Sequence, residues 1–405
     1  MHKHIIFISI DGMTDQLGQS QVLPYLIGLS KNGFEITIVS CEKRTNFEKN
    51  DKTIKNITLS NNITWKYCFY KTKIPLISQL QNFLRLKHLA ENEVKNSKNT
   101  ILHCRSYLPA LIGLQLKKKF GTKYIFDMRG FWADERIDGN IWSLKKPLHK
   151  FLYKYFKRKE IELIGNADCV ITLTNTAKKE IKSWGISTSL PIEVIPCCAD
   201  VNHFNISSNE EKSLVKNELN IPESSSVVGY LGSLGTWYML DEMLDFFVEL
   251  QKKKPNSILF FITNDNEQEI LKAIEAKNIN KTSIIIKPAK RHEVPIYISC
   301  LDIGLFFIKP LYSKKGSSPT KLAELLACGI PIITNTGVGD VDELILDTHC
   351  GVLISAFNKD EYKLAVDKID ILRQSKQFYR DIALANFSLQ KGVDSYKKIY
   401  DTLFL

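Results

Sequence analysis

Short runs of isoleucine, valine and phenylalanine alternate with longer amphipathic stretches along the whole chain. This alternation is typical of βαβ units, because a parallel strand is buried on both faces whereas the helix beside it exposes a polar face. The pattern therefore predicts an α/β protein with a parallel sheet in each half. Strands are expected near residues 4–10, 35–41, 63–69, 100–104, 123–127, 168–174 and 192–196 in the first half, and near 227–231, 257–263, 283–287, 302–308, 330–334 and 350–354 in the second.

The first helix is expected to begin near Ser20, which is a good N-cap, and to end at Gly33. Pro24 is tolerated in the first turn of such a helix. The pattern of the tail, from about residue 358 to residue 405, predicts helix throughout and no further strand. The buried stripe of the first helix is predicted to consist of Val22, Leu23, Leu26 and Leu29.

The length of 405 residues exceeds one ordinary hydrophobic core and suffices for two α/β domains of nearly equal size. A polar segment at residues 205–226, with one short helix in EEKSLVKNEL, separates the two halves. We therefore expect an N-terminal Rossmann-like domain over residues 1–200 and a C-terminal Rossmann-like domain over residues 201–375. Helices over residues 376–405 are expected to pack back toward the first domain. Two such domains imply parallel sheets that face each other across a cleft.

The composition is that of a soluble, folded protein, with 44% hydrophobic and 24% charged residues. No window holds eighteen or more apolar residues, and the start MHKHIIFISID reads as a buried strand rather than a signal peptide, which favours a cytoplasmic location. Nine cysteines are scattered singly apart from the neighbours Cys197 and Cys198, and neither a CxxC pair nor an HExxH motif is present. A reduced compartment is expected, with no structural metal and no cofactor.

The net charge of +11 makes part of the surface basic. Lysines are spread through the predicted helices, as in KKKF and KYFKRK. They either form solvated helix faces or make a peripheral contact with the inner face of an anionic membrane. Nucleic acid is not expected as a partner, because no binding motif and no basic stretch interleaved with aromatic residues accompanies the charge.

The most informative loop runs KKGSSPTK over residues 314–321 and opens the predicted helix KLAELLACG. Glycine and serine let a backbone approach an anion, free amides at a helix N-terminus point outward, and lysines add positive charge. Ser318 or Thr320 is expected to cap this helix, and Glu324 in its first turn could accept hydrogen bonds from both hydroxyls of a ribose. The alternative is an ordinary capped helix with a surface glutamate. The loop therefore favours a phosphate-binding site.

Two glycine-containing loops also connect a predicted strand to a predicted helix. Gly232 and Ser233 lie in one of them, GYLGSLGTW, and Gln16, Gly18 and Gln19 lie in the other, DGMTDQLGQS. Loops that follow parallel strands converge at the sheet's carboxyl edge, where ligands bind. The alternative is that each loop is only a tight turn.

Charged residues cluster at two further strand ends in the first half, and they suggest a polar wall for an acceptor's hydroxyls and a source of acid–base or charge-stabilising groups. The alternative is structural pairing of Arg129 with Asp127, or of Arg136 with Glu135. The candidate acceptor-binding residues are Gln16, Gly18, Gln19, His103, Arg105, Asp134, Glu135 and Arg136, and the candidate catalytic residues are Asp127 and Arg129.

At these residues the chain resembles the family 4 (group 1) glycosyltransferases, which have the two-domain GT-B architecture. SSPTKLAELLACGIPIITNTGVGDVDELI resembles the donor-binding segment of that family, and VIPCCADVNHF resembles the phrase that ends its first domain. The resemblance implies that Glu324 binds the donor ribose and that residues 318–321 bind the diphosphate. The full set of donor-binding residues that we expect is Gly232, Ser233, Lys290, Arg291, Lys315, Gly316, Ser317, Ser318, Pro319, Thr320, Lys321 and Glu324.

The chain departs from the family pattern at three places. Gly316 stands where the family has a second glutamate, which normally contacts the donor sugar. The family's Arg and Lys after the first strand of the donor domain are absent from GSLGTWYMLD, and the family's catalytic-loop histidine is matched only by Asp127 or Arg129. The leaving phosphate would then be neutralised by lysines and an arginine at other positions, namely Lys290, Arg291, Lys309, Lys315 or Lys321.

The resemblance implies transfer of a glycosyl group from a nucleotide sugar to a hydroxyl of a glycan or lipid-linked acceptor. The reaction is expected to be metal-independent and to retain the anomeric configuration, and surface polysaccharide or glycoconjugate biosynthesis is the expected setting. Two alternatives are a non-hydrolysing nucleotide-sugar epimerase and a non-catalytic nucleotide-sugar-binding protein.

Overall fold

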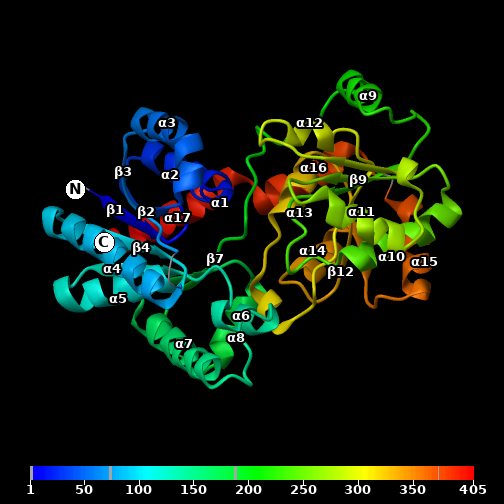
Figure 1. Cartoon of the computed structure of the whole chain (residues 1–405). Coiled ribbons are helices and arrows are strands. Elements are labelled where there is room, and N and C mark those ends of the chain that lie inside the picture. Colours follow the sequence, from blue (N-terminus) through cyan, green and yellow to red (C-terminus); the bar gives the residue numbers. More distant parts are fainter. Residues whose placement is uncertain (1–2, 73–74, 187–188, 373) are drawn as a thin grey trace. The chain divides into compact units, whose positions relative to one another are not determined.

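The computed structural model describes residues 3–72, 75–186, 189–372 and 374–405. The chain forms two compact units, one of residues 1–196 with 389–405 and the other of residues 197–388. Each unit is built on one parallel sheet (Figure 1). All thirteen strands predicted from the hydrophobic runs are present within two residues of the expected limits, apart from β11, which ends earlier.

The sheet of the first unit has seven parallel strands in the order β3-β2-β1-β4-β5-β6-β7. Strand order reverses beside β1, whose neighbours are β2 and β4, and in open α/β sheets ligands bind at the carboxyl edge beside such a reversal. The strands are β1 (His4–Ser9), β2 (Glu35–Glu42), β3 (Ile63–Phe69), β4 (Thr100–Arg105), β5 (Lys123–Asp127), β6 (Cys169–Thr172) and β7 (Ile192–Val194).

Helices cover both faces of this sheet. α5 contacts α4 and α7, so these three helices lie side by side on one face, whereas α2 and α17 pack together on the other (Figure 1). The helices are α1 (Gln16–Gln21), α2 (Leu23–Lys31), α3 (Arg44–Ser60), α4 (Pro75–Asn96), α5 (Tyr107–Phe120), α6 (Trp132–Asp138), α7 (Pro147–Asn166), α8 (Asn175–Ser183) and α17 (Leu389–Phe404).

The sheet of the second unit has six parallel strands in the order β10-β9-β8-β11-β12-β13, and strand order reverses between β8 and β11. The strands are β8 (Val227–Leu231), β9 (Ile258–Ile262), β10 (Ile284–Lys287), β11 (Ile303–Leu305), β12 (Ile332–Asn335) and β13 (Gly351–Ile354). The helices are α9 (Asn209–Glu218), α10 (Leu240–Lys253), α11 (Glu267–Ala276), η1 (Lys281–Ser283), α12 (Val294–Ile298), η2 (Tyr312–Gly316), α13 (Thr320–Ala327), α14 (Val341–Thr348), α15 (Lys359–Lys368), η3 (Ile369–Ile371) and α16 (Lys376–Phe387).

The first predicted helix is two helices, and Ser20 is not an N-cap. α1 begins at Gln16 and ends at Gln21, and α2 begins after Val22, whose φ of −126° and ψ of −65° are not helical. Pro24 explains the break, because proline has no N–H for the carbonyl four residues earlier and its ring collides with that carbonyl. The predicted buried stripe is confirmed, since its members are at most 2% exposed: Val22, Leu23, Leu26 and Leu29.

The tail is helical as predicted, but its two last helices belong to different units. α16 packs against α13 in the second unit, where the Arg380 guanidinium donates to the carbonyls of Val201, Phe204 and Ala327. α17 packs against α2 and β4 in the first unit. The sequence-based division at residues 200 and 376 therefore differs from the compact units, because α16 buries its apolar face against α13. No helix among the described residues is both long and apolar enough to cross a bilayer.

Candidate functional site

Lys321 is the central residue at the carboxyl edge of the second sheet. It lies in the first turn of α13, and its Nζ lies 3.4 Å from the ring centre of Tyr238 and 3.9 Å from that of Tyr230. The Nζ is buried and has no hydrogen-bond partner among the described residues. Burial holds the pKa of Lys321 well below its ordinary range, against the influence of Glu324 and Asp265. A cation confined by two aromatic faces and lacking an anion fits an anionic ligand.

Glu324 lies one turn along α13 from Lys321. It is partly buried, and burial raises the pKa of its carboxyl to about 7, while Arg291 and Lys321 act in the opposite direction. The influence of Arg291 shows that the loop after β10 approaches α13. The predicted donor residues of these two segments are therefore brought together.

The loop after β8 lies against the same lysine. Gly232 has a φ of +96°, and a Cβ placed there would lie 3.8 Å from the Lys321 Nζ. The carboxylate of Asp265, which follows β9, accepts hydrogen bonds from the Ser233 hydroxyl at 3.1 Å and from the Leu234 N–H. Ser233 is thus engaged in holding its own loop, and Gly232 keeps the backbone close to Lys321.

The loop before α13 differs from the prediction in its cap. The N-cap is Pro319, which has no side-chain hydrogen bond, so neither Ser318 nor Thr320 caps the helix. The Ser318 hydroxyl instead accepts a hydrogen bond from the Cys197 N–H at 3.1 Å. Because no side-chain oxygen covers its end, the first turn of α13 keeps the geometry of an anion site.

The remaining predicted donor residues lie before this turn and in the loop after β10. Gly316 ends η2 and is buried, and Ser317 follows it. The Lys315 Nζ lies 4.9 Å from the centre of the Tyr312 ring. The N–H of Lys290 donates to the Glu293 carboxylate at 2.6 Å, and the carbonyl of Arg291 contacts the His203 ring at 3.0 Å.

In the first unit, Glu42 organises the loop after β1. Its fully buried carboxylate accepts four hydrogen bonds, from the N–H groups of Met13 and Thr14 and from the hydroxyls of Thr14 and Ser40. A Cβ at Gly12 would lie 2.6 Å from this carboxylate, so the loop closes only with glycine at that position. Glu42 fixes the path of residues 11–15 at the strand-order reversal.

We expect Glu42→Gln to lower the free energy of unfolding by about 2–4 kcal/mol, because an amide turns an NH₂ group toward donors that the carboxylate accepted from. Urea unfolding of both proteins measures the difference. Glu48→Gln, at an exposed position of α3, is the control and should change stability by less than about 0.5 kcal/mol. Equal stability of the two variants would contradict the role assigned to Glu42.

Two predicted acceptor residues and both predicted catalytic residues lie together, because β4 and β5 pair Arg105 with Asp127. They are His103, Arg105, Asp127 and Arg129. The Arg105 guanidinium donates to the Asp11 carboxylate at 3.1 Å. The Arg129 guanidinium lies 3.8 Å from the Asp127 carboxylate. Arg129 has a φ of +59°, an unusual conformation for a non-glycine residue.

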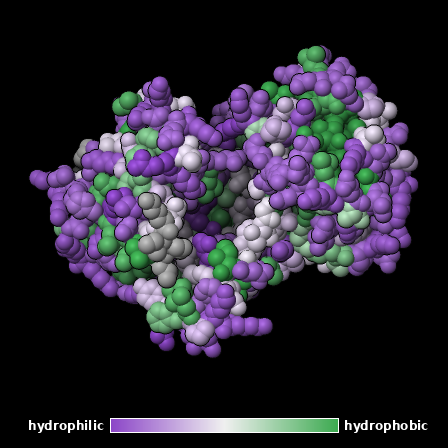
Figure 2. All heavy atoms as spheres, viewed as in Figure 1, coloured by the Kyte–Doolittle hydropathy of each residue, from purple (hydrophilic) through white to green (hydrophobic). Residues whose placement is uncertain are grey.

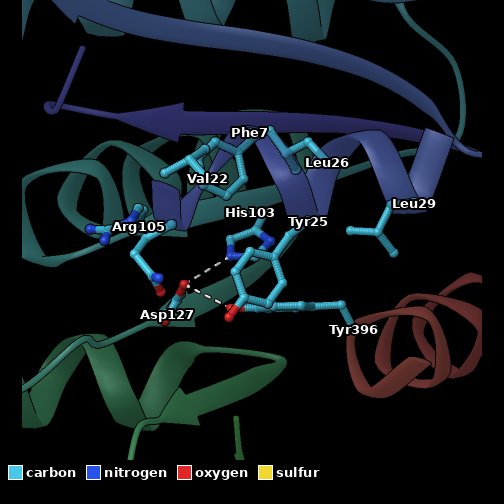
Figure 3. Close-up of a pocket in the computed structure, with 10 residues that line it drawn as sticks. Phe7, Val22, Tyr25, Leu26, Leu29, His103, Arg105, Asp127 and Tyr396 are labelled. Atoms are coloured by element: carbon cyan, nitrogen blue, oxygen red, sulfur yellow. Dashed lines mark hydrogen bonds and ion pairs between the residues drawn. The ribbon is translucent and has the colours of Figure 1, made fainter. Parts of the chain in front are cut away.

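The carboxylate of Asp127 points inward (Figure 3). It lies 3.3 Å from the His103 Nε2 and accepts from the Tyr396 hydroxyl at 3.3 Å, while the Tyr400 hydroxyl contacts the His103 Nδ1 at 2.5 Å. Burial lowers the pKa of His103, and although burial raises the pKa of Asp127, Arg129 and His103 outweigh it and lower that pKa. A neutral His103 that donates from Nε2 and accepts at Nδ1 satisfies this network.

The adjoining cavity measures about 10 Å³, which is room for one water molecule and not for a sugar. Asp127 and His103 are both buried, so their hydrogen bonds hold the carboxyl edge of the sheet in place from within the unit. Asp11, by contrast, is a third exposed and faces solvent beside Arg105.

The other predicted acceptor residues do not join this group through any described hydrogen bond. Asp134 on α6 is buried and accepts from the Tyr153 hydroxyl and the Lys157 Nζ of α7, each at 2.8 Å. The Arg136 guanidinium lies 4.7 Å from the Trp132 ring centre. Glu135 is partly buried on the same helix, Gln16 is exposed, Gly18 packs against the Gly12 carbonyl, and the Gln19 side chain donates to the Thr14 carbonyl.

Several residues of both groups escaped the sequence analysis. Asp265 lies shortly after β9, so the rule that ligand-binding loops follow parallel strands could have found it, whereas Asp11 begins the loop DGMTDQLGQS, which that rule singled out without naming Asp11 as a candidate. Lys314, whose Nζ lies 3.6 Å from the Trp237 ring centre, belongs to a loop that was singled out. Tyr396 and Tyr400 carried no signal, since nothing in the tail indicates which strand it meets.

Two family models match separate parts of the chain. Residues 22–203 match the model described as Glycosyltransferase Family 4, and residues 211–380 match the model described as Glycosyl transferases group 1. A curated D-inositol 3-phosphate glycosyltransferase from Corynebacterium jeikeium is 25% identical over 255 residues, which make up 60% of this chain and 59% of that protein. The match thus spans less than two thirds of the relative's length.

Solved structures match over the full chain. Sucrose-phosphate synthase from Thermosynechococcus elongatus superposes with a TM-score of 0.73 at 15% identity, covering 100% of this chain and 99% of that one. The Anabaena protein HepE, solved in complex with UDP and glucose, superposes with a TM-score of 0.71 at 13% identity, with coverage of 100% and 99%. Identities this low show a shared fold.

Proposed function

The chain belongs to the family 4 (group 1) glycosyltransferases, which have the GT-B fold, and from this premise we propose how it holds its nucleotide-sugar donor. The donor binds at the carboxyl edge of the second sheet and its glycosyl group passes to a hydroxyl acceptor bound by the first unit. The observation that carries the donor assignment is the Lys321 Nζ, which is buried, confined by two aromatic rings and without a described hydrogen-bond partner.

In this proposal Lys321 and the amide groups at the start of α13 bind the diphosphate. Gly232 lets the backbone approach it, and Glu324 accepts hydrogen bonds from the ribose hydroxyls. Positive charge at the leaving phosphate stabilises the transition state without a metal ion. Lys315, Ser318 and the Lys290–Arg291 loop complete the donor site, with Gly316 leaving space where the family has a glutamate.

We further propose that Asp11 and Arg105 meet the acceptor at the edge of the first sheet, together with Gln16, which is exposed at the start of α1. Arg129 stabilises developing charge there, and Asp127 acts by holding Arg129 and His103 in place. The same proposal includes retention of the anomeric configuration. It also includes a cytoplasmic setting in surface polysaccharide or glycoconjugate synthesis, and peripheral membrane contact.

A thermal-shift screen against UDP, GDP, CMP and their sugars tests the donor site. One nucleotide should raise the Tm of the protein, and Glu324→Ala should abolish the rise. Glu343→Ala, at an exposed position of α14, is the matched control and should keep it. If no nucleotide stabilises the folded protein, the donor site is wrong. If the sugar is converted without an acceptor, the protein is an epimerase, and if the donor binds without turnover, it is a binding protein.

A further inference from the structure

An apolar stripe on α7 faces solvent. Its helical members Leu148, Phe151 and Tyr155 are spaced by three and four residues, which places them on one side of the helix, and together with Leu144 in the turn before it they are 40% to 65% exposed. Single exposed apolar residues are common on protein surfaces, but a periodic stripe is not explained by chance. The stripe consists of Leu144 just before the helix and Leu148, Phe151 and Tyr155 within it.

The other sides of α7 already hold the helix in the fold. Phe156 packs its ring 4.7 Å from that of Trp132, and Leu163 and Ile164 are fully buried in the core of the first unit. Lys157 forms ion pairs with Asp134 and Glu160. The exposed stripe is therefore not needed to anchor the helix.

Positive charge accompanies the stripe. The segment of residues 139–159 contains seven lysine or arginine residues and no aspartate or glutamate. Lys150, Lys154 and Arg158 are spaced four residues apart, exposed, and lie along the side of the helix next to Phe151. An apolar stripe beside a basic stripe is the pattern of a helix that lies in the headgroup layer of an anionic membrane.

A second apolar stripe lies on α4, where Ile77, Leu80 and Leu84 are 51% to 58% exposed, and Arg85 beside them is exposed as well. α4 and α7 flank α5 on the same face of the first sheet (Figure 1). Each is a crossover helix that starts near the carboxyl edge, so both stripes, in the first halves of their helices, lie toward that edge.

The second halves of the same helices look different. Lys118 and Lys119 of α5 pair with Glu162 of α7 and Glu91 of α4, as on an ordinary solvated surface. Figure 2 shows hydrophobic residues exposed among hydrophilic ones over the part of the first unit where Figure 1 places α7. Apart from Ile161 of α7 and Phe120 of α5, which are 43% and 37% exposed, the large apolar side chains that the structure describes as exposed on these three helices lie at one end of the layer.

We propose that the first halves of α4 and α7 form a docking surface for an anionic phospholipid membrane, and that the acceptor is a hydroxyl carried by a lipid in that membrane. The acceptor assignment rests on the proposed function, whereas the docking surface locates the membrane contact proposed there and is argued from α4 and α7 alone. The carboxyl edge with Asp11 and Arg105 then faces the headgroup layer. A second copy of the chain is a poorer occupant, because a symmetric contact through this face would oppose two segments of like charge.

Vesicle flotation of the full chain tests the docking surface. We expect binding to vesicles of phosphatidylcholine with phosphatidylglycerol at low salt, at least tenfold weaker binding to phosphatidylcholine alone, and release at high salt. The double variant Leu148→Glu with Phe151→Glu should bind the anionic vesicles at least tenfold more weakly. The matched control is Leu364→Glu with Leu346→Glu, at similarly exposed positions of the second unit, and it should bind within twofold of the unaltered chain.

Three outcomes would overturn the proposal. The unaltered chain could fail to float with anionic vesicles, or both double variants could lose binding equally. Sedimentation equilibrium could also show a dimer that only the α7 variant dissolves, which would assign the surface to a second copy. Nucleotide stabilisation is measured without vesicles, so loss of vesicle binding with intact stabilisation rejects the docking surface alone.

Discussion

Lys321→Met should make the protein more stable and less active. Methionine fills a similar volume between the Tyr230 and Tyr238 rings without a charge to desolvate, and replacing buried ionic groups by well-packed apolar side chains is often neutral or stabilising by about 1–4 kcal/mol. Turnover should fall by about 10²–10³-fold, because the variant lacks the cation that meets the leaving diphosphate. Thermal unfolding and a donor-consumption assay measure the two effects.

The opposite signs of these effects separate a functional lysine from a structural one. If the lysine served the fold, its replacement would lower the stability of the protein. If it serves the donor site, its replacement lowers only turnover and nucleotide affinity. Lys272→Met, at an exposed position of α11, is the control and should leave both quantities unchanged. Full turnover in Lys321→Met would refute the assignment of the diphosphate site.

The pH dependence of the fold has a defined sign at this lysine. Its pKa in the folded protein lies below the ordinary value, so protonation costs more in the folded state than in the unfolded state. The stability of the unliganded protein should therefore fall as pH drops from the ordinary lysine pKa toward the folded one. Lys321→Met should remove that part of the slope.

Local pattern predicted the strands well, because most of them are buried on both faces and read as apolar runs, whereas the edge strands β3 and β10 are partly exposed. It also singled out Lys321 and Glu324, which the structure places one turn apart on α13. It failed at the break before Leu23, where the helical periodicity continues through Val22 although Pro24 interrupts the hydrogen bonds. The error there came from weighing the apolar stripe above the backbone chemistry of proline.

Contacts between distant segments could not be predicted from local pattern. His103 meets Tyr400 and Asp127 meets Tyr396, and both tyrosines are supplied by a helix near the end of the chain. Likewise the separation of α16 from α17 depends on which sheet each helix packs against, and both are amphipathic helices of similar length. Such choices are made by tertiary packing, which a single sequence does not display.

Donor affinity should rise about tenfold between pH 6 and pH 8, because the Glu324 carboxyl has a pKa of about 7 and its ionised form is the better double acceptor for a ribose. A nucleotide sugar is the right probe, since its diphosphate is esterified at both ends and does not titrate in this range. Isothermal titration with the nucleotide sugar that stabilises the protein, performed at several pH values with the unaltered chain, measures the rise.

Glu324→Gln identifies the titrating group. A glutamine keeps one acceptor oxygen and cannot ionise, so the variant should bind more weakly at pH 8 and show no dependence on pH. The sign for stability is opposite. The pKa of Glu324 rises from 4.5 in the unfolded state to about 7 in the folded state, so the free energy of unfolding falls as pH rises from 4.5 to about 7, by about 3 kcal/mol at most. The unliganded variant should therefore be the more stable protein at pH 8. If its donor affinity still rises with pH, another group titrates, and the ribose belongs to a different residue.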